Sequence, residues 1–222
     1  GIRQLGLELQ KQVIKRIHLL IGHTHWDHIH GFPFFAPASV ADCELNIFAP
    51  AGFQRSLEDT LAGQMQYSYF PVKLGELASR IHFTELEEGL LRIGNVLVET
   101  QYLNHTAPTI AYRISDSDST IAYVTDHEPF WNPLGRTFRH PGDQRHIDFL
   151  RKADLVIHDA QYTEEEYRTR RSWGHSMIDY ATDVAMAAGA KVLALFHHDP
   201  AHDDDAIKEL ERCKRAGMIG CM

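Results

Sequence analysis

The chain has 222 residues, of which 44% are hydrophobic, and 30 acidic against 22 basic side chains give it a formal net charge of −8. This length suffices for one large domain with a hydrophobic core, and the ordinary hydrophobic fraction excludes wholesale disorder. No apolar run reaches the ~18 residues of a transmembrane helix, and the acidic balance argues against a protein that holds long nucleic acid by bulk electrostatics.

The cysteines and histidines narrow the class of protein further. Cys43, Cys213 and Cys221 show no paired spacing, so we expect no disulfide framework and a cytoplasmic location. The fifteen histidines are the unusual feature of the composition, because histidine is the commonest metal ligand and carries protons near neutral pH. Their positions in the chain therefore direct the search for a functional site.

Helical and strand-like segments alternate in the first third of the chain. Residues 1–10 have the pattern of a helix interior, and the chain begins with Gly1 rather than Met. We therefore expect the numbering to start within a longer natural chain, with a processed or tag-cleaved terminus as the alternative. Residues 17–21 and 45–49 are short apolar runs typical of buried strands, and residues 52–63 have helical spacing.

The middle of the chain contains two hairpin signals. Residues 90–102 hold the sequence Ile-Gly-Asn-Val at 93–96, which predicts a tight turn between two strands. Residues 109–114 and 120–125 are strand-like and flank the polar stretch 115–118. These segments predict an antiparallel part of a sheet.

The last third changes character, because its strand-like segments are separated by helices. Residues 154–157 and 191–196 are apolar strands, and a predicted helix between them, 178–188, ends at Gly189. A C-terminal helix over 203–216 has an acidic first turn and a basic last turn, as the helix dipole favours. We expect a single layered α/β domain over residues 1–222. The stretch 132–145 lacks periodicity and is expected to be a loop.

A dense set of metal-ligand residue types follows the first predicted strand, in the sequence His23-Thr24-His25-Trp26-Asp27-His28. Residues two apart at a strand end point the same way, so His23 and His25 can bind one ion together. Asp27 and His28 fall on the following turn, where they can face a second ion. Imidazole and carboxylate donors at this density favour Zn²⁺, with Mn²⁺ or Fe²⁺ as alternatives. Four solvated polar residues on a loop are the weaker interpretation.

This motif resembles the HxHxDH signature of the metallo-β-lactamase-fold hydrolases, and the resemblance runs in order along nearly the whole chain. It implies a four-layer αββα fold, with N-terminal strands that complete one sheet missing from the numbered chain. Asn104-His105 is similar to the family's third-motif histidine, Thr125-Asp126 to its metal-bridging aspartate, and His197 to its last ligand histidine. The resemblance implies one metal ion held by His23, His25, His105 and Asp126, and a second held by Asp27, His28, Asp126 and His197.

Each of these assignments has a simpler alternative in the sequence. His105 can be a solvated loop histidine, and Asp126 can cap a turn. His197 and His198 both end the same predicted strand, and alternation directs only one of them inward. The family pattern favours His197, which leaves His198 as a supporting residue.

Two further segments resemble motifs of the ribonuclease Z branch of this family. Ile157-His158-Asp159-Ala160 and Gly174-His175-Ser176 stand where that branch has a proton-shuttling carboxylate and histidine. Glu is usual at the position of Asp159, so the reach of the carboxylate is shorter here. His175 is the better candidate for protonating a leaving alkoxide, oriented by Asp159 or His158, and a helix N-terminal residue is the alternative. The resemblance thus implies Asp27, Asp159 and His175 as catalytic residues.

Local positive charge fits a phosphate substrate despite the acidic total, because guanidinium groups suit phosphate oxygens. Solvated surface arginines are the alternative. The arginines in question are Arg136, Arg139, Arg145, Arg168, Arg170 and Arg171.

The ribonuclease Z branch includes tRNA 3′-processing endonucleases and small phosphodiesterases. The endonucleases carry a long basic arm between the third-motif histidine and the bridging aspartate, whereas only twenty residues separate His105 from Asp126. We therefore expect a dinuclear metal-dependent hydrolase that cleaves a small, linear or cyclic, phosphodiester with a metal-bridging hydroxide. The resemblance also implies a homodimer.

Other functions remain open from the sequence. They are a ribonuclease Z-like RNA endonuclease, a non-catalytic sensor domain and a diiron site of the same fold. A glyoxalase-like thioester hydrolase is a further alternative, although it leaves the two branch motifs unexplained. β-Lactam hydrolysis is disfavoured because the family members that catalyse it are usually exported and lack these motifs.

Overall fold

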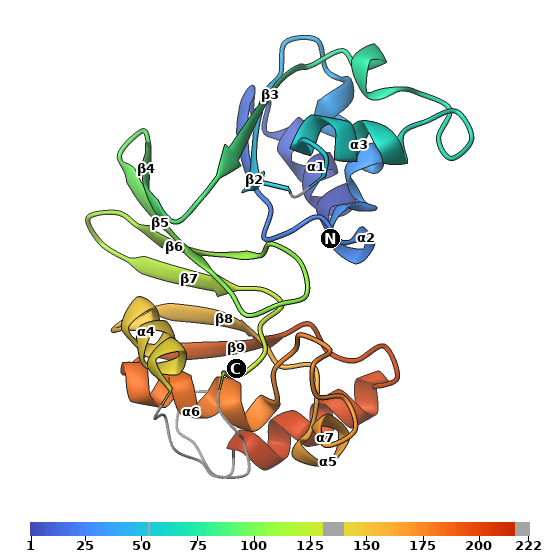
Figure 1. The fold of residues 1–222 in the computed structure, drawn as a ribbon. Helices are drawn as coiled ribbons and strands as arrows, with labels where there is room; N and C mark the ends of the chain where they lie inside the picture. Colours follow the sequence, from blue (N-terminus) through green and yellow to red (C-terminus); the bar gives the residue numbers. More distant parts are fainter. Residues whose placement is uncertain (53, 131–139, 216–222) are drawn as a thin grey trace. The chain divides into compact units, whose positions relative to one another are not determined.

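The computed structural model describes residues 1–52, 54–130 and 140–215 (Figure 1). The chain divides into two compact units, Gly1–Glu87 and Glu88–Met222, and each unit has its own sheet and core. The single-domain organisation and the further N-terminal strands stay predictions.

The first unit is built on a parallel sheet with the strand order β1-β2-β3. Leu45, Ile47 and Ala49 alternate along the central strand and are fully buried, so one face of this strand forms the centre of the core. Its strands are β1 (Arg16–Leu20), β2 (Glu44–Pro50) and β3 (Arg80–Leu86). Its α-helices are α1 (Ile2–Lys11), α2 (Trp26–Ile29) and α3 (Leu57–Gln64), and its 3₁₀ helices are Phe32–Phe34, Ala36–Ser39 and Leu74–Glu76.

The second unit is built on a mixed six-stranded sheet with the order β4-β5-β6-β7-β8-β9. The pairs from β4 to β7 are antiparallel, and the pairs β7–β8 and β8–β9 are parallel. Its strands are β4 (Gly89–Ile93), β5 (Val96–Tyr102), β6 (Ile110–Ser115), β7 (Thr120–Val124), β8 (Leu155–Asp159) and β9 (Val192–Phe196). Its helices are α4 (Pro141–Leu150), α5 (Glu164–Tyr167), α6 (Ile178–Ala188) and α7 (Asp204–Arg215).

The topology of the second sheet brings distant parts of the chain to one edge. Strands β7, β8 and β9 are parallel, and β5 runs in the same direction as β7 because both are antiparallel to β6. The carboxyl ends of β5, β7, β8 and β9 therefore meet at the same edge of the sheet (Figure 1). Loops at this edge are the usual place for a functional site in a sheet of this kind.

Most predicted elements are confirmed by the structure. The strands at 17–21, 45–49, 154–157 and 191–196 and both hairpins are present, as is a helix over the first ten residues. The helix predicted at 178–188 has these bounds, and Gly189 ends it in the left-handed conformation with φ +66°. The C-terminal helix is present from Asp204 to Arg215, and Ala216 lies outside the described residues.

Two local predictions need correction, and one strand lies outside the predictions. The helix expected at 52–63 begins at Leu57, because the Ser56 hydroxyl accepts a hydrogen bond from Asp59 N and caps it there. The loop expected at 132–145 is wrong in its last part, since α4 begins at Pro141 with Nδ1 of His140 accepting from Gly142 N; residues 132–139 lie outside the described residues. Strand β3 was not predicted, although Ile81 and Phe83 show its alternation.

No described helix combines the length and the apolar character that crossing a membrane would require.

Candidate metal centre

In the first unit, the histidines of the HxHxDH motif lie close together. The motif follows β1, and α2 begins at Trp26 with His25 as its N-cap residue. The ring centroids of His23 and His25 are 4.5 Å apart, and those of His23 and His28 are 4.1 Å apart. Oδ2 of Asp27 lies 3.2 Å from Nε2 of His28. A single helical turn after the strand is therefore enough to gather these imidazole and carboxylate donors.

In the second unit, Asp126 is the centre of the candidate site. It follows β7 and is buried. Its Oδ2 lies 3.7 Å from Nε2 of His105, whereas its Oδ1 lies 3.5 Å from Nε2 of His197. Two ligand atoms of one tetrahedral ion are roughly 3.3 Å apart when each bond is about 2.0–2.1 Å long. Each oxygen of this carboxylate is thus paired with a different histidine at close to the spacing of shared ligands.

His105 is held in an orientation typical of a metal ligand. Its Nδ1 is 2.8 Å from the carbonyl oxygen of Gly174. A carbonyl only accepts, so Nδ1 carries the hydrogen and Nε2, which faces Asp126, carries the lone pair. Histidines that bind metals usually donate their other ring N–H in this way. The donor set of this unit therefore fits a divalent cation.

His197 reaches Asp126 by an unusual backbone conformation. It follows directly on β9 and has φ +60°, which is uncommon for a residue other than glycine. Such conformations persist where the surrounding structure fixes them, often at functional sites. Of the two histidines that end this strand, His197 is the one with Nε2 beside Asp126. The other histidine, His198, is partly buried, and this burial is the main cause that lowers its pKa.

Asp159 and His175 form a second part of the site. Oδ2 of the buried Asp159 lies 3.2 Å from Nδ1 of His175 and accepts hydrogen bonds from the backbone N–H groups of His127 and Ser176. The shorter aspartate therefore does reach the histidine. The ring of His175 stacks on that of His197 with centroids 5.0 Å apart. The structure thus places a carboxylate–histidine pair next to the candidate ligands of this unit.

His158 lies in a separate buried pair of histidines. Its Nδ1 is 2.7 Å from the carbonyl oxygen of Asp159, and its Nε2 is 2.9 Å from Nε2 of His146. Nδ1 of His158 must therefore donate, and its Nε2 accepts from His146. Burial lowers the pKa of both rings, and for His146 the neighbouring His127 and His158 lower it further. Both rings are neutral at pH 7, and the carboxylate of Asp159 is the group that lies against His175.

The arginines singled out in the sequence are placed differently from one another. Arg145 pairs with Glu88, and Arg168 pairs with Glu164 at 3.2 Å. Arg170 lies over the ring of Tyr162, 5.1 Å from its centroid. Since the Tyr162 ring in turn contacts the ring of His175, Arg170 is linked to the site through Tyr162. Arg136 and Arg139 lie outside the described residues.

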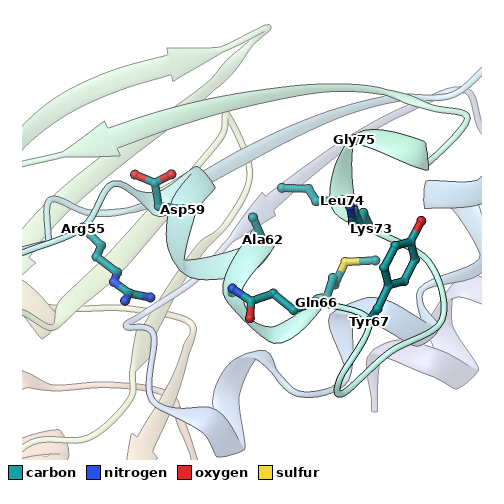
Figure 2. A pocket seen from close by; sticks show the side chains of 10 residues that line it. Arg55, Asp59, Ala62, Gln66, Tyr67, Lys73, Leu74 and Gly75 are labelled. Atoms are coloured by element: carbon teal, nitrogen blue, oxygen red, sulfur yellow. The ribbon is translucent and has the colours of Figure 1, made fainter.

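A hollow of about 560 Å³ lies elsewhere in the first unit (Figure 2). It is lined by Arg55, Asp59, Tyr67 and Lys73 among others, with the Lys73 ammonium over the Tyr67 ring. The candidate metal ligands and catalytic residues are not among its lining residues.

Sequence reasoning missed the turn that supports His105. The motif includes Gly174, but it gives no role to Glu128, which accepts hydrogen bonds from this turn. The sequence does contain a signal for Glu128, because this residue is a second carboxylate only two positions after Asp126.

Residues 3–198 match the family described as the Beta-lactamase superfamily domain. The chain belongs to the β-lactamase superfamily. This superfamily protein is similar to ribonuclease Z of Bacillus mycoides (strain KBAB4), with 25% identity in an alignment that covers 86% of this chain and 73% of the relative.

Solved structures show the same fold. The match to the crystal structure of the short form of human tRNase Z covers 82% of this chain and 73% of the tRNase Z chain, with 20% identity and a TM-score of 0.62. The match to the crystal structure of a diphosphatase of the PhnP family covers 97% of this chain and 72% of the diphosphatase chain, with 16% identity and a TM-score of 0.65. The α/β chain therefore has the metallo-β-lactamase fold, as predicted. Together the comparisons support a metal-dependent hydrolase of this fold.

Proposed function

We propose that this superfamily protein is a phosphodiesterase that binds two divalent metal ions, Zn²⁺ in the first place, and hydrolyses a small linear or cyclic phosphodiester. The observation that carries the proposal is the position of Asp126, with one carboxylate oxygen beside His105 and the other beside His197. A carboxylate with a histidine at each oxygen is suited to hold two cations next to each other.

Each unit contributes part of the proposed ligand set. The first unit offers three clustered histidines and Asp27, and the second offers Asp126 and two histidines. We propose that the two units act together as one hydrolase domain. The proposed ligands of one ion are His23, His25, His105 and Asp126, and those of the other are Asp27, His28, Asp126 and His197.

The chemistry divides between the metal ions and the protein's own groups. Bound divalent cations supply an activated water molecule at neutral pH and stabilise negative charge on a phosphoryl group. His175 supplies the proton for the leaving oxygen. The carboxylate of Asp159 accepts from Nδ1 of His175, which orients the ring and leaves Nε2 as the atom that can donate a proton.

The size of the substrate is argued from the segment between His105 and Asp126. The hairpin of β6 and β7, Ile110–Ser115 and Thr120–Val124, fills most of this segment, so it contributes strands to the sheet. The net charge of −8 also provides no excess of cations for a long polyanion. Both observations favour a substrate with one phosphodiester group.

A second candidate is an RNA endonuclease, which the similarity to ribonuclease Z favours. The same purified protein decides between the two. Metal content is measured first, and hydrolysis of bis-p-nitrophenyl phosphate, 2′,3′-cyclic nucleotides and a precursor tRNA is then compared. We expect hydrolysis of the small diesters and at most slow cleavage of the tRNA. Metal-loaded protein that hydrolyses none of the diesters would contradict the proposal, and iron as the bound metal would favour a diiron site.

A further inference from the structure

The turn that precedes His175 has a strained backbone. Ser172 has φ +69° and Gly174 has φ +90°. Positive φ at a residue with a side chain, such as Ser172, is costly and persists only where neighbouring groups enforce it. The turn of residues 172–174 therefore needs a partner that holds it in place.

Glu128 is that partner. Its Oε1 accepts hydrogen bonds from Ser172 N at 2.7 Å and from the Tyr167 hydroxyl at 2.7 Å. Its Oε2 accepts from Gly174 N at 2.9 Å. One carboxylate thus binds backbone N–H groups at both ends of the turn and is itself steadied by a tyrosine. Such charge-assisted hydrogen bonds are stronger than those between neutral groups.

The opposite side of the turn faces His105. The carbonyl oxygen of Gly174 accepts from Nδ1 of His105 at 2.8 Å, and a Cβ at position 174 would lie only 2.2 Å from that nitrogen. The position of the turn therefore determines the tautomer and the orientation of the His105 ring. His175 follows directly, so the same turn also determines where that side chain begins.

Glu128 is tied to His105 by a second path. Its backbone N–H donates to the carbonyl oxygen of Asn104 at 2.8 Å, and Nδ2 of Asn104 donates to the carbonyl oxygen of Glu128 at 2.9 Å. Asn104 is the residue before His105. The backbone of Glu128 thus holds the loop that carries His105, while its side chain holds the turn that bonds to the His105 ring.

We propose that Glu128 is a positioning residue that fixes His105 in its metal-binding orientation, and places His175, through the turn of residues 172–174. The effect on metal affinity rests on the proposed function, whereas the effect on the His105 tautomer does not. Glutamine at position 128 would keep only one accepting oxygen and would turn an NH₂ group toward a backbone N–H, so it cannot hold both ends of the turn.

The chain offers a matched control in Glu166. This glutamate also accepts from a backbone N–H and from side chains, namely Thr163 N at 2.8 Å, the Thr163 hydroxyl at 2.9 Å and His202 Nε2 at 2.8 Å. It caps α5 and its described bonds do not involve the turn. Comparing Glu128→Gln with Glu166→Gln therefore separates positioning of His105 from a general loss of stability.

The experiment has two readouts. In metal-free protein with ¹⁵N-labelled histidine, the ring spectrum reports the His105 tautomer, and the signal is assigned by its absence in His105→Asn. Zn²⁺ affinity is measured by competition with a chromophoric chelator. We expect Glu128→Gln to lose the pure Nδ1–H signal and to weaken Zn²⁺ binding about tenfold, near the lower end of the range for groups that orient metal ligands. Glu166→Gln should lower the melting temperature and leave both readouts unchanged.

Several outcomes would overturn the proposal. An unchanged tautomer signal in Glu128→Gln would do so, as would equal effects of the two glutamine variants. If wild-type protein binds no Zn²⁺, the proposed function fails while the tautomer readout still tests Glu128. If Glu128→Gln does not fold, Tyr167→Phe removes one donor to Glu128 and should shift the His105 signal in the same direction to a smaller extent; no shift would contradict the proposal.

Discussion

The two units prepare their candidate ligands in different ways. In the first unit the ligands lie within six consecutive residues, and one strand end followed by one helical turn gathers them. In the second unit they come from loops after β5, β7 and β9, with Asp159 at the end of β8. The first arrangement depends on local conformation, whereas the second depends on strand order and on a strained turn. We therefore expect the second unit to be more sensitive to single substitutions.

The largest expected difference is between two aspartates. Asp126→Asn should reduce diester hydrolysis by more than the roughly 10²–10⁴-fold that one general acid contributes, because both oxygens of Asp126 face histidines. Asp27→Asn, in the first unit, should cost less because Asp27 is proposed to bind a single ion. Kinetics and metal content of both variants are measured, with Asp118→Asn at an exposed turn as control. A greater loss in Asp27→Asn would reverse the comparison.

The variant His175→Ala tests the proposed role of His175 as the proton donor to the leaving group. His175→Ala should lower kcat by about 10²-fold or more while KM and metal content stay near wild-type values, since this residue is not in the proposed ligand set. Its effect should shrink with substrates whose leaving group is acidic, such as p-nitrophenolate, because such a group needs no proton. A loss of kcat that is the same for acidic and basic leaving groups would argue against the acid role.

The buried histidine pair makes the second unit sensitive to acid. Burial lowers the pKa of His146 and His158 below the ordinary 6.5, so the unfolded chain binds protons that the folded chain does not. Their contribution to stability is complete above pH 6.5 and is lost as pH falls from there toward the lowered values. In that range, each ring that is protonated only in the unfolded chain lowers the free energy of unfolding as the pH falls.

Urea unfolding between pH 7 and pH 5 measures this slope. His146→Gln keeps a donor for Nε2 of His158 and removes one titrating group, so its slope should be shallower by about one proton. A slope that does not change would show that His146 is not neutral in the folded protein.

The last comparison concerns the glycine of the strained turn. Gly174→Ala would place a Cβ 2.2 Å from Nδ1 of His105 at a position with φ +90°. This variant should lower the unfolding free energy by about 1–3 kcal/mol and should also weaken Zn²⁺ binding. Gly189→Ala has φ +66° with no atom within 4 Å of the new Cβ, so it should cost only the backbone term of about 1–2 kcal/mol. In the first unit, a Cβ at Gly31 would lie 2.6 Å from the Cγ2 methyl of Ile2, so Gly31→Ala should lower stability without changing Zn²⁺ affinity. Chemical denaturation and chelator competition compare the three; Zn²⁺ affinity lost equally in all would contradict the account.

The sequence determined the features that arise from neighbouring residues. The HxHxDH motif, the turn at Gly94 and the helix end at Gly189 depend on local backbone preferences, and the structure has the predicted strands and helix at these places. The start of α3 was missed by several residues because the Ser56 cap competes with the weaker apolar spacing before it. For His105, Asp126 and His197 the sequence supplied candidates through resemblance, but no spacing along the chain could show that they meet.

Only the tertiary structure decided which groups act on one another in the second unit. Strand order brings Asp126 between His105 and His197. It also places Asp159 close enough to His175 for the side chain of an aspartate, which is shorter than that of a glutamate, to reach the ring. Glu128 and the turn at Gly174 acquire their meaning only when chain segments more than forty residues apart are hydrogen-bonded. Local patterns encode local geometry, whereas the direction in which a carboxylate or an imidazole points is fixed by hydrogen bonds to distant parts of the chain.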